Sequence, residues 1–231
     1  MKSIFLKSVL LIITCNQINA QQTSGLTNSA GLPETLNYNK ITSGTSGKTL
    51  NYGDIEGSPY FKIEYESASV DGFQEVVLAR YNMFTDEIEF KKNGTILSLP
   101  KSNDYKKIKF NTTQKTLMWI DGNLDDKGYY FVLQDGKNKL LRKNKVRFVD
   151  ETEATSSYSI SKPATFKILP VDYFVLSTSN ELASIKNLKE FANRFPKEKE
   201  SINSFVKANK IKADKEGDLL KLINYLNEFQ D

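Results

Sequence analysis

Residues 87–97 read EIEFKKNGTIL, and this stretch has the form of a β-hairpin. Apolar Ile88 and Phe90 alternate with charged neighbours, which is typical of a strand that is buried on one face. Asn93-Gly94 then separates this strand from a second apolar run, and both turn residues tolerate the positive φ angles of a tight hairpin. The stretch therefore predicts two antiparallel strands joined by a short turn.

The same pattern continues on both sides of this hairpin. Asp71-Gly72 and Asp135-Gly136 also lie between apolar runs and give further hairpin signals. We expect residues 57–178 to form an antiparallel β domain, a meander that is either an open sheet or a partial barrel. Its other strands are predicted at residues 61–65, 74–78, 107–110, 116–120, 129–133, 140–141, 146–149 and 166–176.

The last part of the chain, residues 179–231, changes to a helical period. Apolar residues recur three or four positions apart at 181–195, after Pro196, and at 219–229. Short amphipathic helices must bury their apolar stripes against one another, against the sheet or against another protein. The predicted fold class is therefore α+β, an antiparallel sheet followed by a small helical region of about three helices.

Residues 1–20 have the features of a secretion signal. Lys2 and Lys7 precede a short apolar core, and Ala20 supplies a small residue at the cleavage point. The apolar core is shorter than the roughly 20 residues that cross a bilayer, and we predict no transmembrane segment later in the chain. We therefore expect an exported protein of the periplasm, the outer-membrane surface or the medium. Lipid attachment at Cys15 is an alternative way of processing the same signal.

Residues 21–56 are rich in Ser, Thr, Gly and Asn. Their isolated apolar residues follow neither the period of a strand nor that of a helix. We expect a flexible polar N-terminal segment, with at most a short piece laid on the core.

Composition limits the chemistry of the exported protein. The chain has no histidine, and its single cysteine, Cys15, lies within the predicted signal. Most metal sites and nucleophilic catalysts use imidazole or thiol groups, so we predict no catalytic residue, no metal and no cofactor. The formal charge of +4 includes Lys2 and Lys7, and the remainder is too mild for a nucleic-acid-binding face.

Two patterns offer chemistry without histidine. Glu87 and Glu89 would share one face of a strand, as the carboxylates of a glycosidase share a site, although exposed strand carboxylates usually serve solubility. Residues 121–128 place oxygen ligands at alternate positions like the start of a calcium loop, but Asp126 stands where that loop needs glycine. A polar turn accounts for the same residues.

Five residues are candidates for binding. Arg80, Tyr81 and Asn82 fall between two strand patterns, where they either form a recognition surface or pin a loop onto the sheet. Trp119 and Tyr130 offer an aromatic platform for a glycan or a peptide.

Several short runs of the chain resemble exported, β-rich bacterial envelope proteins of Bacteroidetes-like type that have no assigned activity. The runs are 54–60 (DIEGSPY), 78–82 (LARYN) and 86–90 (DEIEF), and residues 186–195 followed by 202–226 are similar to the closing helices of those proteins. The resemblance implies a Gram-negative envelope or secreted setting and transfers no catalytic residue.

These observations favour a non-catalytic binding or scaffolding protein of the cell envelope. Its expected partner is a cell-envelope protein, with a glycan or a lipid as the other candidate ligands. Two alternatives stay open: an enzyme that acts on polysaccharide through carboxylates, and a carrier of an apolar ligand inside the β domain.

Overall fold

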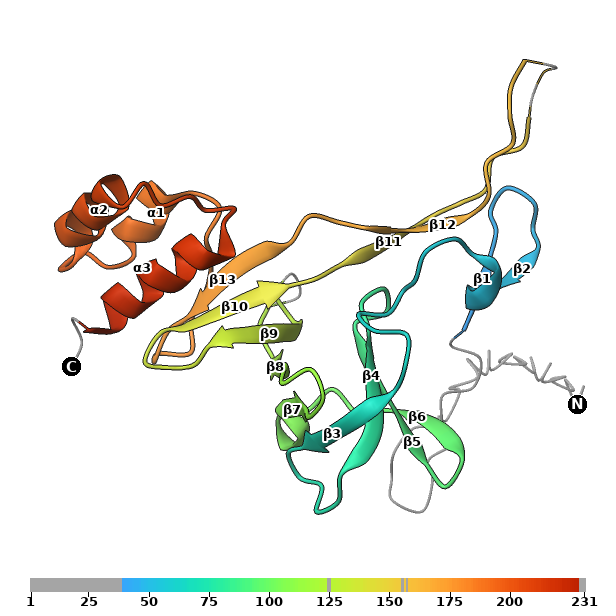
Figure 1. The fold of residues 1–231 in the computed structure, drawn as a ribbon, viewed down its shortest axis with the longest axis horizontal. Helices are drawn as coiled ribbons and strands as arrows, with labels where there is room; N and C mark the ends of the chain where they lie inside the picture. Colours follow the sequence, from blue (N-terminus) through green and yellow to red (C-terminus); the bar gives the residue numbers. More distant parts are fainter. Residues whose placement is uncertain (1–38, 124–125, 155, 157, 229–231) are drawn as a thin grey trace, which may run out of the picture.

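The computed structural model describes residues 39–123, 126–154, 156 and 158–228. Ten antiparallel strands form the main sheet: β3 (Glu66–Val70), β4 (Val77–Asn82), β5 (Glu87–Lys92), β6 (Thr95–Ser98), β7 (Lys107–Phe110), β8 (Thr116–Ile120), β9 (Gly128–Gln134), β10 (Lys139–Lys143), β13 (Asp172–Leu176) and β14 (Leu182–Ser184). Their order is β14-β13-β10-β9-β8-β7-β3-β4-β5-β6, so β14 and β6 are the two edges of an open sheet. Three helices follow, and the predicted α+β class is confirmed (Figure 1).

The hairpin that decides the fold has the predicted turn. Asn93 and Gly94 have φ angles of 51° and 78°, and Lys92 pairs with Thr95 on either side of them. The strands predicted at 107–110 and 116–120 lie at those residues. Alternation and turn chemistry therefore located these elements correctly.

The sheet curls around a core of aromatic side chains. In the strand order, β9 and β4 are separated by β8, β7 and β3. The ring of Tyr81 on β4 nevertheless lies 5.8 Å from the ring of Phe131 on β9, measured between centroids. Phe61 packs on the other side of Phe131, at 4.5 Å. The curl thus encloses a core while the described strands leave both edges open.

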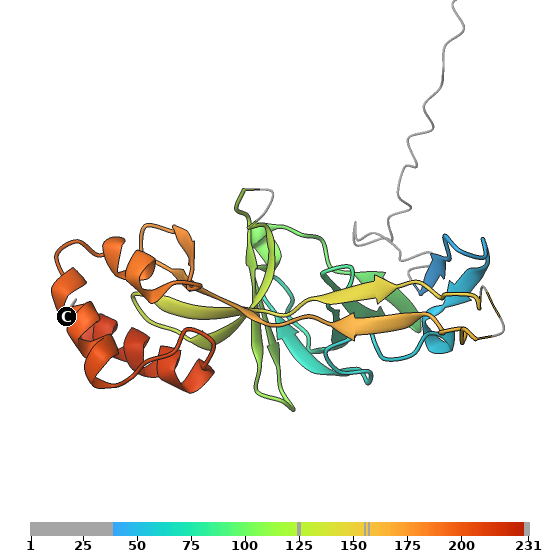
Figure 2. The ribbon, with the colours of Figure 1, turned by 90° about the horizontal axis from the view of Figure 1, so that it is seen from above.

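A long two-stranded ribbon runs from the sheet to the far end of the molecule. β10 is followed by β11 (Val146–Val149), and β12 (Thr165–Ile168) is followed by β13, with antiparallel pairing in both halves. Figure 2 shows the ribbon passing from the helices to the opposite end. We call residues 146–168, which are β11, β12 and the loop between them, the arm.

The ribbon contains a bulge that the sequence pattern did not predict. Lys143 pairs with Asp172 and Val146 with Ile168, so two residues on one strand face three on the other. Pro170 lies in the longer stretch and has no N–H to donate to a ladder. The single strand predicted over 166–176 is therefore wrong, because it is split into β12 and β13.

The first described residues brace the arm where β11 leads into the loop. β1 (Lys40–Thr42) and β2 (Thr49–Asn51) form a hairpin, and a 3₁₀ turn follows over Tyr52–Asp54. The Thr45 N–H donates to Asp150 Oδ2 at 3.0 Å. Residues 39–56 therefore differ from the flexible segment expected over 21–56, because sparse aromatic anchors such as Tyr52, which is buried, give no period to read. Residues 21–38 and the predicted signal over 1–20 lie outside the described residues.

The three helices pack on the sheet at one end, beside β10 and β13. They are α1 (Leu188–Asn193), α2 (Lys199–Ala208) and α3 (Glu216–Glu228). The apolar stripe of α3 is fully buried in a cluster with Leu140 of β10 and Val175 of β13; its members are Leu219, Leu222, Ile223 and Leu226. The stripe thus packs inside the protein. Among the described helices, none is long and apolar enough to cross a membrane.

The helix predicted over 181–195 begins later than expected. Residues 182–184 form β14, in which Ala183 pairs with Val175. The helix starts only after Asn187, whose side chain accepts hydrogen bonds from two N–H groups of the first turn. The prediction was wrong for 181–187, because an available strand edge outweighed the helical period.

Packing of α3 on the sheet can be tested with Leu222→Ala. The Leu222 side chain is 0% exposed, so its truncation leaves a cavity and should lower the free energy of unfolding by about 2–5 kcal/mol in urea titrations. Leu78→Ala, at a position that is 49% exposed, is the control and should change it little. Equal losses in the two variants would contradict internal packing of the stripe.

Candidate functional site

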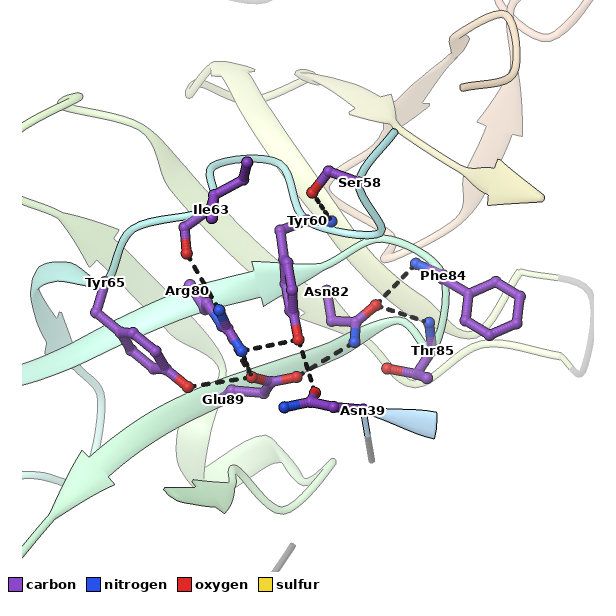
Figure 3. A network of polar contacts seen from close by, with 10 residues as sticks. All are labelled: Asn39, Ser58, Tyr60, Ile63, Tyr65, Arg80, Asn82, Phe84, Thr85 and Glu89. Carbon is purple, nitrogen blue, oxygen red and sulfur yellow. Dashed lines mark hydrogen bonds and ion pairs between the residues drawn. The ribbon is translucent and has the colours of Figure 1, made fainter. Parts of the chain in front are cut away.

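The predicted triplet of Arg80, Tyr81 and Asn82 lies at the end of β4 and divides between two networks. Side chains alternate along a strand, so Arg80 and Asn82 share one face while Tyr81 points to the other. Arg80 and Asn82 both contact Glu89 of β5, as Figure 3 shows. Tyr81 contacts Asp86 in the turn that joins these two strands.

Arg80 and Glu89 form a buried ion pair. Arg80 Nε and Nη2 lie 2.9 and 2.7 Å from Glu89 Oε2, and the Glu89 residue is 1% exposed. Asn82 donates its side-chain N–H to Glu89 Oε1 at 3.2 Å, and the Tyr65 hydroxyl donates to Oε2 at 3.2 Å. A buried carboxylate is tolerated when it is paired and hydrogen-bonded in this way.

The ion pair lies beside a wide bulge in the sheet. Tyr60 forms a bridge with Asn82, and pairing resumes only where Glu66 faces Ala79. Residues 61–65 thus face only two residues of β4. The strand predicted over 61–65 is therefore wrong.

Arg80 fills the interruption that this bulge creates. Its Nη1 donates to the carbonyl of Ile63 at 3.1 Å, which gives that group a partner in place of the ladder. The guanidinium carbon lies 3.6 Å from the centre of the Tyr60 ring and 4.4 Å from that of Tyr65. Such contacts are favourable cation–π interactions. In a regular strand Tyr60 and Tyr65 would face opposite sides of the sheet. The bulge instead places both rings against Arg80.

The network extends to the first described residue and to the next turn. Tyr60 donates its hydroxyl hydrogen to Asn39 Oδ1 at 2.8 Å. Asn82 Oδ1 accepts the N–H groups of Phe84 and Thr85 at 3.1 and 3.2 Å. The amide of Asn82 therefore fixes the start of the β4–β5 turn while its other end holds Glu89 (Figure 3).

A second ion pair, which sequence reasoning missed, joins Asp86 and Lys143. Lys143 Nζ lies 2.8 Å from Asp86 Oδ1 and donates to the Tyr129 carbonyl, also at 2.8 Å. The Tyr81 hydroxyl donates to the same Asp86 oxygen at 2.6 Å. Burial lowers the pKa of the Lys143 ammonium, and the Asp86 charge opposes that shift. The available signal was that Lys143 shares a strand face with buried Leu141.

Gly128 makes room for this second pair. It adopts a φ of 151°, and a Cβ at this position would overlap both Lys143 Nζ and the Asp86 carboxylate. The glycine that ends the stretch 121–128, which resembles the start of a calcium loop, is therefore needed for packing. In the same loop Lys127 Nζ lies 2.8 Å from Asp121 Oδ1, and residues 124–125 lie outside the described residues.

A cavity of 280 Å³ lies beside the Asp86–Lys143 pair. Its polar lining comes from Asp86, Lys127, Tyr130, Lys143 and Lys145, and its apolar lining comes from Met83, Phe84, Val146, Leu169 and Phe174. The cavity therefore combines a lysine-rich wall with an apolar wall.

Trp119 and Tyr130 do not form the predicted aromatic platform. They are 1% and 2% exposed, so neither ring presents a face to solvent. The Trp119 ring lies 5.1 Å from that of Tyr129, and the Tyr130 hydroxyl donates to the Asp126 carbonyl at 2.8 Å. The alternation of side chains along a strand could not show that both faces of the sheet are buried at Trp119 and Tyr130.

Glu87 and Glu89 have different surroundings. Glu89 is held by Arg80, whereas burial raises the pKa of Glu87 and the Lys101 charge opposes that shift. Over the described part of the chain, no group of three acidic, histidine or cysteine side chains is placed to hold a metal.

No protein-family model matches this chain, and no curated protein or solved structure shows significant similarity to it.

Burial of the tyrosines predicts an unusual alkaline titration. Burial is the largest cause of a raised pKa at seven positions and brings the pKa of Tyr52 to about 12; the others are Tyr60, Tyr65, Tyr81, Tyr129, Tyr130 and Tyr173. The folded protein keeps these protons where the unfolded chain loses them, at a pH of about 10. Stability should therefore fall as the pH rises above about 10.

The measurement is tyrosinate absorbance together with circular dichroism during an alkaline titration. We expect most of the absorbance to appear only as the fold is lost, whereas the chain in urea titrates at a pH of about 10. Complete ionisation of the tyrosines in a protein that is still folded would contradict the assignment.

Proposed function

We propose that the protein is a non-catalytic, exported binding or scaffolding protein of the bacterial cell envelope, with a protein partner that contacts the tip of the arm. The observation that supports this proposal is the exposure of Tyr158 and Ile160, at 100% and 84%. Both belong to the loop between β11 and β12, which projects beyond the body (Figure 1). Exposed apolar side chains grouped in this way are typical of contact surfaces.

The arm is fixed at the loop-side end of β12, which favours a role in presenting the loop. Glu56 forms a bridge with Thr165, and the Phe166 N–H donates to the Glu56 carbonyl at 2.7 Å. Phe166 is buried, and its ring lies 5.1 Å from that of Tyr52. A tip that is held in place loses less conformational freedom when it binds a partner.

The two alternative functions receive less support. An enzyme that uses carboxylates needs both groups free to act on substrate, but Glu89 is 1% exposed and paired with Arg80. A carrier needs space inside the β domain. The concave face is instead occupied by rings in contact, such as those of Tyr81 and Phe131.

The test is affinity capture from cell-envelope extract with tagged residues 21–231. We expect a stoichiometric protein partner whose recovery falls about tenfold in the double variant Tyr158→Ser, Ile160→Ser, because anchor residues often contribute more than 1 kcal/mol each. The matched control is Ile63→Ser, Val76→Ser, which changes two apolar residues that are 60% and 58% exposed on the body. Equal recovery with both variants, or the absence of any stoichiometric partner, would contradict the proposal.

A further inference from the structure

We propose that the cavity beside Lys143 is a binding site for a small amphiphilic carboxylate, an organic acid with a compact apolar body. The site lies at the base of the arm and is separate from its tip. It can therefore exist whether or not the tip binds a protein.

The apolar wall sets the size and character of the ligand body. It is built from the β4–β5 turn, the start of β11, the ribbon bulge and β13 through five side chains: Met83, Phe84, Val146, Leu169 and Phe174. A volume of 280 Å³ holds about ten non-hydrogen atoms, if each takes the roughly 30 Å³ that a water molecule occupies in the liquid. A body of that size would bury its apolar surface against this wall.

The polar part of the lining carries an excess of positive charge. Lys127, Lys143 and Lys145 line the cavity, against the single carboxylate of Asp86. Lys143 is 6% exposed and has three N–H donors, two of which are directed to Asp86 and to the Tyr129 carbonyl. Its Nζ also lies 4.8 Å from the centre of the Tyr130 ring, a weak cation–π contact that a carboxylate could replace.

The other two lysines can exchange their present partners for a ligand. Lys127 pairs with Asp121 at 2.8 Å and Lys145 with Asp172 at 3.9 Å, and neither carboxylate lines the cavity. Both pairs are about half exposed, and exposed pairs of this kind contribute only about 0–1 kcal/mol. A carboxylate that enters beside the apolar wall would meet the same ammonium groups in a less polar medium, where the attraction is stronger.

Together the two walls favour an acid over a neutral apolar molecule or a bare anion. A neutral molecule would leave the lysines without a counter-charge, and inorganic phosphate would leave the apolar wall uncovered. Octanoate and 3-phenylpropanoate both have a body of suitable size. Comparison of their affinities shows whether the cavity prefers an aliphatic or an aromatic ligand body.

The test is isothermal titration calorimetry of residues 21–231 with these two acids, with octan-1-ol and with inorganic phosphate. We expect one of the acids to bind at a single site at least about tenfold more tightly than octan-1-ol or phosphate. Lys127→Met, Lys145→Met should weaken binding of that acid about tenfold, and Leu169→Trp should abolish it by filling the cavity.

The matched control is Arg147→Met, Lys167→Met, which removes the same charge from two exposed, facing residues of the arm that do not line the cavity. This variant should bind the acid as the unmodified protein does. The proposal is overturned if octan-1-ol binds as tightly as the acids. It is also overturned if the two charge variants bind alike, or if neither acid binds at about 10 mM. Circular dichroism of each variant verifies the fold. If Leu169→Trp unfolds, the comparison of Lys127→Met, Lys145→Met with its matched control still decides the test.

Discussion

The buried ion pair between Arg80 and Glu89 is the interaction on which the rest of the structure depends. One guanidinium group joins β4 to β5 through Glu89, supplies a donor to the carbonyl of Ile63, and lies against Tyr60. It therefore fixes the bulged segment on the sheet. Just before that segment, Tyr52 and Ile55 are buried in the core, and Glu56 pairs with Thr165 of the arm.

The second ion pair joins parts of the curled sheet that are far apart in the strand order. Asp86 lies in the turn of the β4–β5 hairpin, and its partner Lys143 belongs to β10. In the strand order, β9, β8, β7 and β3 lie between β10 and β4. The contact holds the hairpin turn beside that strand, next to the aromatic core that contains Tyr81 and Phe131. Both ion pairs use charged residues of one hairpin. One pair joins neighbouring strands and the other joins residues 57 positions apart, and the cost of removing these charges from water is offset by their hydrogen bonds.

The sequence predicted features that local chemistry determines. Asn93-Gly94 specified a turn because both residues accept positive φ, and the stripe around Leu222 specified a helix with one buried side. Partners far apart in the chain could not be read in this way. Asp86 and Lys143 are 57 positions apart, and alternation assigned Glu89 to a solvent face because nothing local reveals the bulged segment that covers it.

The same limit applies to the candidate sites. Arg80, Tyr81 and Asn82 were predicted either to recognise a ligand or to pin a loop, and their contacts are those of pinning residues. The lysine-lined cavity was not predicted, because its walls come from elements that meet only through the ribbon and the curl of the sheet.

The most direct measurement is a double-mutant cycle on the central ion pair, with Arg80→Met, Glu89→Gln and the combined variant unfolded in urea. Each single change should lower the free energy of unfolding by about 3–5 kcal/mol, because it leaves the other polar group buried without its partner. The combined variant should lose clearly less than the sum of the two single losses. Losses that add to within about 0.5 kcal/mol, or single losses below about 1 kcal/mol, would contradict the account.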